Sequence, residues 1–386
     1  MRRPKTIYEE ITQGMPQARP IWPLVLVCAV PALCLGGFRL ICRDKALVNT
    51  LVWDYTSPLK HAIARLCGLL PWNTAEVCWT IGVLGAIALV GSSAAALIRC
   101  ILRRRQGAAS PGSLLLRRGL VILAAALWVY LGYTALWGIN YYADTFSERS
   151  GLEGRRTTAA ELSLLLNAFA DACNDSASQV SRDAEGLFAP DWETVFQRSL
   201  GQYAALYGEF PCLDLEESTP RPMFWSKIMS ALGFTGFYFP FTGESLVNVD
   251  APAALVPATI LHELAHQRNV APEDEANFLA VVVGLHSADA EFRYSSALMG
   301  YIHLSNALYD ADRDLWREAD SRLSEQVRTD LRYNNAFWRR HDTPAADAAE
   351  AVYSSFARSY GQEDIMKSYG ACVDLIAAYY LPKEGS

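Results

Sequence analysis

Three long apolar segments near the N-terminus restrict the possible folds of this chain more than any other feature. They cover residues 21–41, 77–98 and 120–139, and only the first contains a charged residue, Arg39, close to its end. A helix needs about 20 mostly apolar residues to cross a bilayer. A soluble protein can bury one such helix, but three in succession are typical of a membrane anchor. We therefore predict an anchor domain, residues 1–142, with three transmembrane helices.

The distribution of Lys and Arg predicts the orientation of this anchor. Basic residues are concentrated in two places: Arg2, Arg3, Lys5 and Arg19 at the N-terminus, and Arg99, Arg103, Arg104, Arg105, Arg117 and Arg118 between the second and third segments. Cytoplasmic loops carry the excess of positive charge. The N-terminus is thus expected in the cytoplasm, the segment 42–76 outside it, and the remainder, residues 143–386, in an extracytoplasmic domain of a multi-pass membrane protein.

Charge and cysteine usage exclude some classes of function. The formal net charge is -7, and the one dense basic cluster is the loop that topology already explains, so the chain does not resemble a nucleic-acid-binding protein. Of nine cysteines, only Cys173, Cys212 and Cys372 fall in the outer domain. They lack the CxxC spacing of a metal site. One disulfide among the three is possible, and the sequence does not identify its pair.

The outer domain is predicted to be mainly α with a small β-sheet. Residues 158–179 begin with Thr158 and Glu161, the spacing of a capping box, before a helical apolar pattern. Residues 189–210 are expected to form a similar helix with Asp191 at its N-cap. The stretch 234–249 is rich in aromatic and β-branched residues and interrupted by Gly and Pro, which predicts strands and a turn. Helical patterns return after about residue 275.

The stretch "LHELAHQRNVAPEDEANFLA", residues 261–280, carries the chemistry. On a helix, His262 and His266 share one face, so both imidazoles can reach one ion. Glu263 lies about 100° around the helix from His262, placed to accept a proton from a water rather than to bind the ion. Two neutral nitrogen ligands and such a carboxylate are the elements of an HExxH zinc site. We predict one Zn²⁺ here, with Glu263 as general base.

A catalytic zinc needs a third protein ligand and an open fourth position. The acidic start of a second helix supplies candidates for the ligand. Glu273 and Asn277 are four residues apart and share a face, so if Glu273 binds the metal, Asn277 can hold a histidine ring nitrogen. Glu275, on another face, is the alternative ligand. Tyr294 and Tyr369 are candidates for stabilising a developing oxyanion, with packing as the simpler role for both.

The helix pair resembles that of the gluzincin metallopeptidases, whose second helix carries Glu-x-x-x-Asp. Glu273 and Asn277 match these positions, with Asn in place of Asp and a shorter spacing from His266. The chain also resembles a bacterial family known as domain of unknown function 3810, through "NYYADTFSERSGL", "GFYFPFTGESLVNV", the histidine stretch, "FRYSSALMGYIH" and "KSYGACVDLI". These resemblances imply a zincin-like α+β catalytic domain with peptidase-like chemistry in a bacterial cell membrane.

The function expected from the sequence is a membrane-anchored zinc metallopeptidase acting on a peptide or protein outside the cytoplasm. In this hypothesis "FTGESLVNV", residues 241–249, is an edge strand along which an extended substrate pairs. The alternative is a non-catalytic, membrane-tethered interaction or sensory module that metal stabilises. A purely structural site does not need the glutamate of HExxH, which favours the enzyme.

Overall fold

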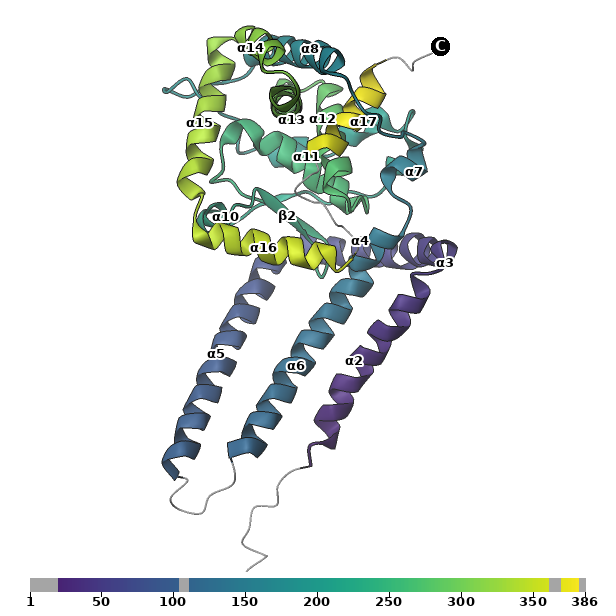
Figure 1. The fold of residues 1–386 in the computed structure, drawn as a ribbon, viewed down its shortest axis with the longest axis vertical. Helices are drawn as coiled ribbons and strands as arrows, with labels where there is room; N and C mark the ends of the chain where they lie inside the picture. Colours follow the sequence, from purple (N-terminus) through teal and green to yellow (C-terminus); the bar gives the residue numbers. More distant parts are fainter. Residues whose placement is uncertain (1–19, 104–110, 361–368, 382–386) are drawn as a thin grey trace, which may run out of the picture. The chain divides into compact units, whose positions relative to one another are not determined.

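The computed structural model describes residues 20–103, 111–360 and 369–381, and these are mostly helical (Figure 1). The chain forms two compact units. Unit 1 contains the residues through Leu40 together with Leu84–Gly132, and unit 2 contains Ile41–Val83 and the chain from Tyr133 onward.

Unit 1 consists of helices with the length and composition of membrane spans. They are α2 (Trp22–Ile41), α5 (Thr74–Arg103) and α6 (Pro111–Leu136), of which α5 begins and α6 ends within unit 2. Each contains an apolar window sufficient to cross a membrane, at Trp22–Ile41, Thr74–Arg99 and Leu115–Leu136. The three predicted helices are thereby confirmed, and they indicate a membrane protein.

Unit 2 includes Ile41–Val83 as well as the chain from Tyr133 onward. The stretch after α2 folds into α3 (Lys45–Thr50), a π-helical turn η1 (Leu51–Thr56) and α4 (Ser57–Gly68), and all three belong to unit 2. The reason is a buried polar contact: the side chains of Ser57 and Lys60 hydrogen-bond Asn269. Since buried polar groups need partners, these bonds fix α4 against the unit.

The core of unit 2 is a layer of packed helices. The predicted helix at 158–179 is confirmed as α8 (Ala159–Ala177), including the capping box between Thr158 and Glu161. It packs on α13 (Ala290–Ala311), and α13 packs on α11 (Val256–Gln267) and α12 (Glu273–Leu285). The surrounding helices are α7 (Phe146–Ser150), α14 (Arg313–Ser321), α15 (Glu325–His341), α16 (Pro344–Arg358) and α17 (Tyr369–Tyr380).

The prediction of a single helix at 189–210 is wrong. The chain forms a short helix, α9 (Val195–Arg198), and a 3-10 turn, η4 (Gln202–Leu206), instead. Gly201, with φ of +79°, separates them, since a left-handed residue ends a helix. The Asp191 side chain accepts hydrogen bonds from Glu193 N and the Thr194 hydroxyl rather than capping a long helix.

The predicted strands and turn at 234–249 are confirmed as β2 (Gly236–Phe239) and β3 (Glu244–Val247). With β1 (Arg221–Pro222) they form a sheet of order β1-β3-β2, in which β3 runs parallel to β1 and antiparallel to β2. The expectation that 241–249 forms the edge is therefore wrong, because β3 is paired on both sides and fully buried. In the described chain, β2 is the longer edge strand, and α11 packs on both β2 and β3.

Short elements complete unit 2. They are η3 (Gly138–Tyr142), η5 (Pro211–Leu213), α10 (Ser226–Ala231) and η6 (Ala253–Leu255). Cys173, Cys212 and Cys372 are all free thiols, and Cys173 and Cys372 are buried.

Candidate metal centre

The HExxH motif lies on α11, which is almost entirely buried. Every residue from Val256 to Gln267 is buried except His262, which is partly exposed. Pro257 occupies the first turn, where its missing N–H costs nothing, and the free N–H of Ala258 donates to the Ser295 hydroxyl at 2.9 Å. A helix in this position has to supply partners for its polar side chains, because unpaired buried charge is costly.

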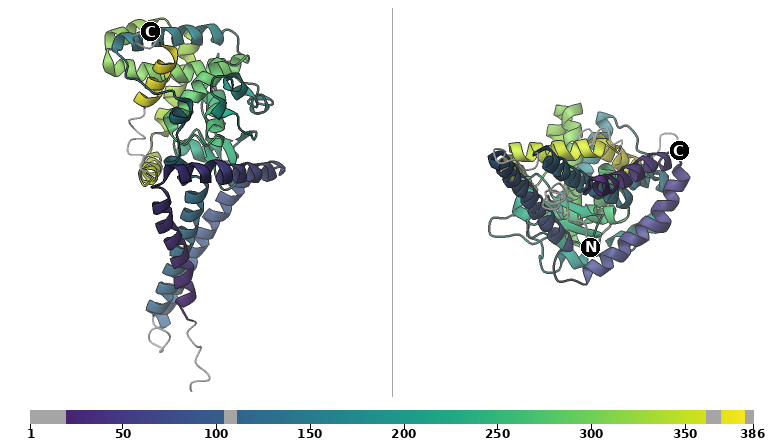
Figure 2. Two further views of the ribbon diagram at one scale, coloured as in Figure 1. Left: turned by 90° about the vertical axis from the view of Figure 1, so that its right-hand side faces the viewer. Right: turned by 90° about the horizontal axis from the view of Figure 1, so that it is seen from below.

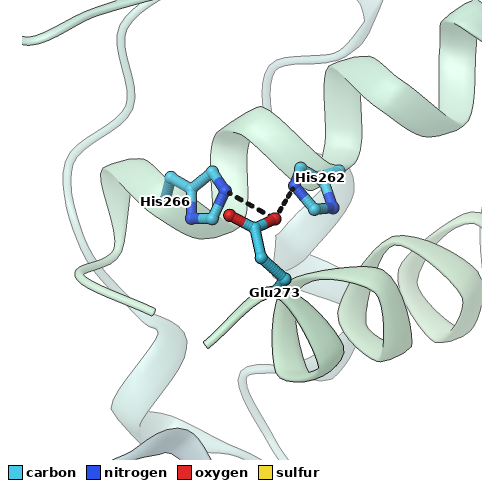
Figure 3. Close-up of side chains that lie close together, drawn as sticks. All are labelled: His262, His266 and Glu273. Atoms are coloured by element: carbon cyan, nitrogen blue, oxygen red, sulfur yellow. Dashed lines mark ion pairs between the residues drawn. The ribbon is translucent and has the colours of Figure 1, made fainter. Parts of the chain in front are cut away.

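Three side chains from two helices converge at this point (Figure 3). His262 Nε2 lies 3.1 Å from Glu273 Oε2, and His266 Nε2 lies 3.6 Å from the same oxygen. Among the described residues, His262, His266 and Glu273 form the one group of potential ligands whose donor atoms all lie within 4.8 Å of one another. Ligands at about 2.0–2.2 Å around a tetrahedral zinc stand about 3.3 Å apart, so these separations suit a single ion.

The other nitrogen of each imidazole is held by an acceptor. His262 Nδ1 lies 2.9 Å from Asn277 Oδ1, and His266 Nδ1 lies 2.7 Å from the carbonyl oxygen of Val270. A carbonyl only accepts, so each Nδ1 donates, and each Nε2 is the nitrogen that faces Glu273. Asn277 thus contacts the ring of His262, in line with the expectation that it holds a histidine nitrogen.

A left-handed turn at the end of α11 makes the short spacing between His266 and Glu273 possible. Asn269, with φ of +60°, follows the last helical residues, and the N–H groups of Asn269 and Val270 donate to His266 O and Ala265 O. This is the hydrogen-bond pattern of a Schellman motif, with Asn in the position that Gly usually takes. The turn reverses the chain so that the Val270 carbonyl reaches His266 and α12 starts with Glu273 toward the histidines.

Glu263 faces β2 rather than the three ligands. It is 2% exposed, and its Oε2 has no hydrogen-bond partner among the described residues. An added Cβ on Gly236 would stand 2.6 Å from Glu263 Oε1, so glycine is needed there for the carboxylate to fit. Burial raises the pKa of Glu263 to about 7. The arrangement leaves one buried carboxylate oxygen beside the cluster with capacity to bind a proton or a water.

The sequence analysis missed Tyr353, which completes the surroundings of Glu273. Its hydroxyl, from α16, donates to Glu273 Oε1 at 2.6 Å, so both carboxylate oxygens of Glu273 are engaged. Tyr353 lies 80 positions from Glu273 and belongs to no recognisable motif. Trp137 and Tyr141, from "WGINYYAD", also flank the site: the Trp137 ring meets the His266 ring edge-on at 5.6 Å.

The charges within the cluster fit a cation. Partial burial raises the pKa of Glu273, but the His266 and His262 imidazoles outweigh it and hold that pKa well below its usual range. Conversely, burial lowers the pKa of His266, and the Glu273 carboxylate outweighs it and raises that pKa to about 9. Glu273 is therefore an anion facing two imidazole nitrogens, the donor set of a His₂Glu zinc site.

The other candidates from the sequence lie elsewhere. The Glu275 carboxylate accepts hydrogen bonds from Phe146 N and Ser147 N at 2.8 and 3.0 Å. These bonds secure the start of α7, and they direct the carboxylate away from the histidines. The buried Tyr294 hydroxyl donates to Asp330 and plays a structural part there. Tyr369 is the first residue of α17, and its side chain lies outside what the structure describes.

Comparison with known proteins yields one match. A family model with the description "Protein of unknown function (DUF3810)" matches residues 55–377. No curated protein and no solved structure matches the chain. The match starts at η1, so it includes α4 as well as the histidine stretch.

The single zinc ion that the sequence predicts can be tested by metal content. Purified full-length protein should contain close to one equivalent of zinc, and His262→Ala should remove nearly all of it because two ligands bind zinc far more weakly than three. Metal content by mass spectrometry is the measurement. His286→Ala is the matched control, since His286 Nδ1 bonds the Val282 carbonyl within α12. Equal zinc content in wild type and His262→Ala would contradict the assignment.

A second prediction concerns Tyr353. Tyr353→Phe should lower zinc affinity by about 10-fold or more, as expected for loss of a hydrogen bond to a metal ligand. Competition with a chromogenic chelator measures the affinity. Tyr309→Phe, a change of the same kind on the exposed surface of α13, should leave it unchanged. Identical affinities for Tyr353→Phe and wild type would show that Tyr353 does not support Glu273.

Proposed function

We propose that this chain, which belongs to the family described as "Protein of unknown function (DUF3810)", is a membrane-anchored zinc metallopeptidase. The observation that carries the proposal is the convergence of His262, His266 and Glu273 on one point, with Glu263 buried beside them and not engaged as a ligand. A site that only bound metal for stability would have no use for this carboxylate. The catalytic domain in this proposal is zincin-like, with α11 and α12 as its two metal-binding helices.

Zn²⁺ in this site supplies Lewis acidity, which polarises a carbonyl group and makes a water more acidic. His262, His266 and Glu273 would hold the ion, and Asn277 and the Val270 carbonyl fix the two rings. Glu263 accepts the proton of the attacking water on its carboxylate and delivers it to the leaving amine nitrogen. Burial against Gly236 keeps this carboxylate in one position and supports its role as general base.

The edge of the sheet suggests how a peptide binds. Asn248 N–H donates to Thr235 O at 2.8 Å, and Gly236 pairs with Val247. Because hydrogen-bonded and non-hydrogen-bonded pairs alternate in an antiparallel ladder, the backbone N–H and C=O groups of Gly236 and Tyr238 face away from β3. An extended peptide adding to β2 would pass next to Glu263, which contacts Gly236. The substrate class in this proposal is thus an extended segment of peptide or protein.

The proposed location is the bacterial cell membrane, with the metal centre outside the cytoplasm. The six arginines between the second and third membrane segments and the basic N-terminus support a cytoplasmic position for both. An odd number of crossings then brings unit 2 to the outer side.

Catalysis is tested by changing the general base alone. Glu263→Gln should retain zinc and lose hydrolysis by about 10²–10⁴-fold, the usual contribution of general acid–base catalysis. Purified protein is incubated with a peptide library, and cleavage is followed by mass spectrometry with and without a zinc chelator. Cleavage that persists in Glu263→Gln would contradict the mechanism. Zinc binding without any cleavage by wild type would favour the non-catalytic module.

The topology has its own test. Protease added to intact spheroplasts should degrade residues 143–386 and spare an epitope placed in the arginine loop, because only the former is expected outside. Permeabilised cells, in which both are accessible, provide the control. Protection of unit 2 until permeabilisation would invert the topology without affecting the metal site.

A further inference from the structure

An exposed apolar turn lies at the start of α10. Phe224, Trp225 and Ile228 expose 81, 42 and 51% of their surface, and the exposed Lys227 lies among them. Soluble proteins rarely leave large apolar side chains grouped in this way without a partner.

This turn is bound to the first residues of α5. The Glu76 carboxylate accepts hydrogen bonds from Phe224 N at 3.1 Å and Trp225 N at 2.9 Å. Asn73 Nδ2 donates to the Pro222 carbonyl at 2.8 Å. The apolar side chains are therefore fixed beside the first turn of a helix that is long and apolar enough to cross a membrane.

A second exposed apolar surface lies on the stretch that leads into α5. Tyr55, Leu59 and Leu66 recur at helical spacing through η1 and α4 and expose 65, 52 and 67%. The opposite face of α4 is buried and polar, with Ser57 and Lys60 bonded to Asn269. Helix α4 is thus amphipathic in an unusual sense: its polar face is turned inward and its apolar face is left outside.

The two apolar surfaces are joined through Arg221. Its guanidinium donates to the carbonyl oxygens of Gly68, Leu70 and Trp72 at 2.8–3.0 Å. Arg221 closely precedes the α10 turn, and Leu69 is itself 81% exposed. Figure 1 labels α3, α4, α10 and α16 along the same end of unit 2, and Figure 2 shows that end from two further sides.

We infer that one lipid-contacting surface, made up of Leu59, Leu66, Leu69, Phe224, Trp225 and Ile228, lies in the interface of the bilayer. Continuity with α5 identifies the partner, because Phe224 and Trp225 are hydrogen-bonded to the residue at the third position of that helix. Aromatic residues favour the interface, and Lys227 can reach lipid headgroups. This inference does not depend on the proposed hydrolysis.

The lipid-contacting surface also connects the bilayer to the metal centre. Through Ser57 and Lys60, the inner face of α4 holds Asn269, whose left-handed turn positions Val270 and Glu273. One short helix therefore separates the membrane surface from the turn between the two metal-binding helices. Resting on the proposed function, a corollary is that the site would meet substrates close to the membrane surface.

Quenching of tryptophan fluorescence by lipid tests the inference. Full-length protein is reconstituted in phosphatidylcholine vesicles with or without bromine on the acyl chains. The contribution of Trp225 is the difference between the wild-type and Trp225→Phe emission spectra. This difference should be much smaller in brominated vesicles than in unbrominated ones.

Trp192 is the control, because it is equally exposed, at 43%, but lies elsewhere on unit 2. It follows Asp191, whose N–H donates to Glu291 near the start of α13. The difference between the wild-type and Trp192→Phe spectra should be the same in both kinds of vesicle.

A gain-of-signal variant makes the test independent of Trp225. Leu66→Trp adds a fluorophore on the outer face of α4, and the added emission should also be quenched by brominated lipid. Quenching of both the Trp225 emission and the emission added by Leu66→Trp, with Trp192 unaffected, supports a lipid-contacting surface. Unquenched emission from both positions would overturn the inference and assign the surface to a protein partner or a second copy of the chain.

Discussion

The left-handed turn at Asn269 is the constraint on which the cluster of His262, His266 and Glu273 depends. Six residues separate His266 from Glu273, so the chain must reverse sharply if both are to reach one point. Asn tolerates this backbone conformation better than most residues. Its side chain adds a second function, because it accepts from Lys60 and donates to Ser57, which fixes the turn against α4. A glycine would permit the turn but could not make either contact.

The buried environment of α11 explains why polar residues continue past the histidines. Arg268 is fully buried, donates to the carbonyls of Leu213 and Leu264, pairs with Glu217 and stacks over the Tyr203 ring. A buried cation is tolerated only with such a complete set of partners. Gln267 bonds both N–H and C=O of Ser218, which aligns the chain before β1. These contacts fix the C-terminal end of α11, and its histidines are directed toward α12.

The sequence was most informative where one local pattern determines the outcome. Apolar length identified the membrane-type helices, the Thr158 capping box identified α8, and helical spacing paired His262 with His266 and Glu273 with Asn277, with Glu275 left as an alternative to Glu273. Features that depend on distant contacts were missed. Tyr353 reaches Glu273 from a helix 80 positions away, and α4 joins unit 2 through Asn269, more than 200 positions away. Likewise, β1 has two residues, too few for a strand pattern, yet it makes β3 a central strand.

Zinc K-edge X-ray absorption of the purified full-length protein tests the central claim most directly. A site of His262, His266 and Glu273 predicts nitrogen and oxygen donors at about 2.0–2.2 Å, with the outer-shell scattering of two imidazoles and no sulfur. The Glu263→Gln spectrum should show the same ligands, since Glu263 faces Gly236 and is not among them. Sulfur scattering at about 2.3 Å, a third imidazole, or a changed ligand set in Glu263→Gln would contradict the account.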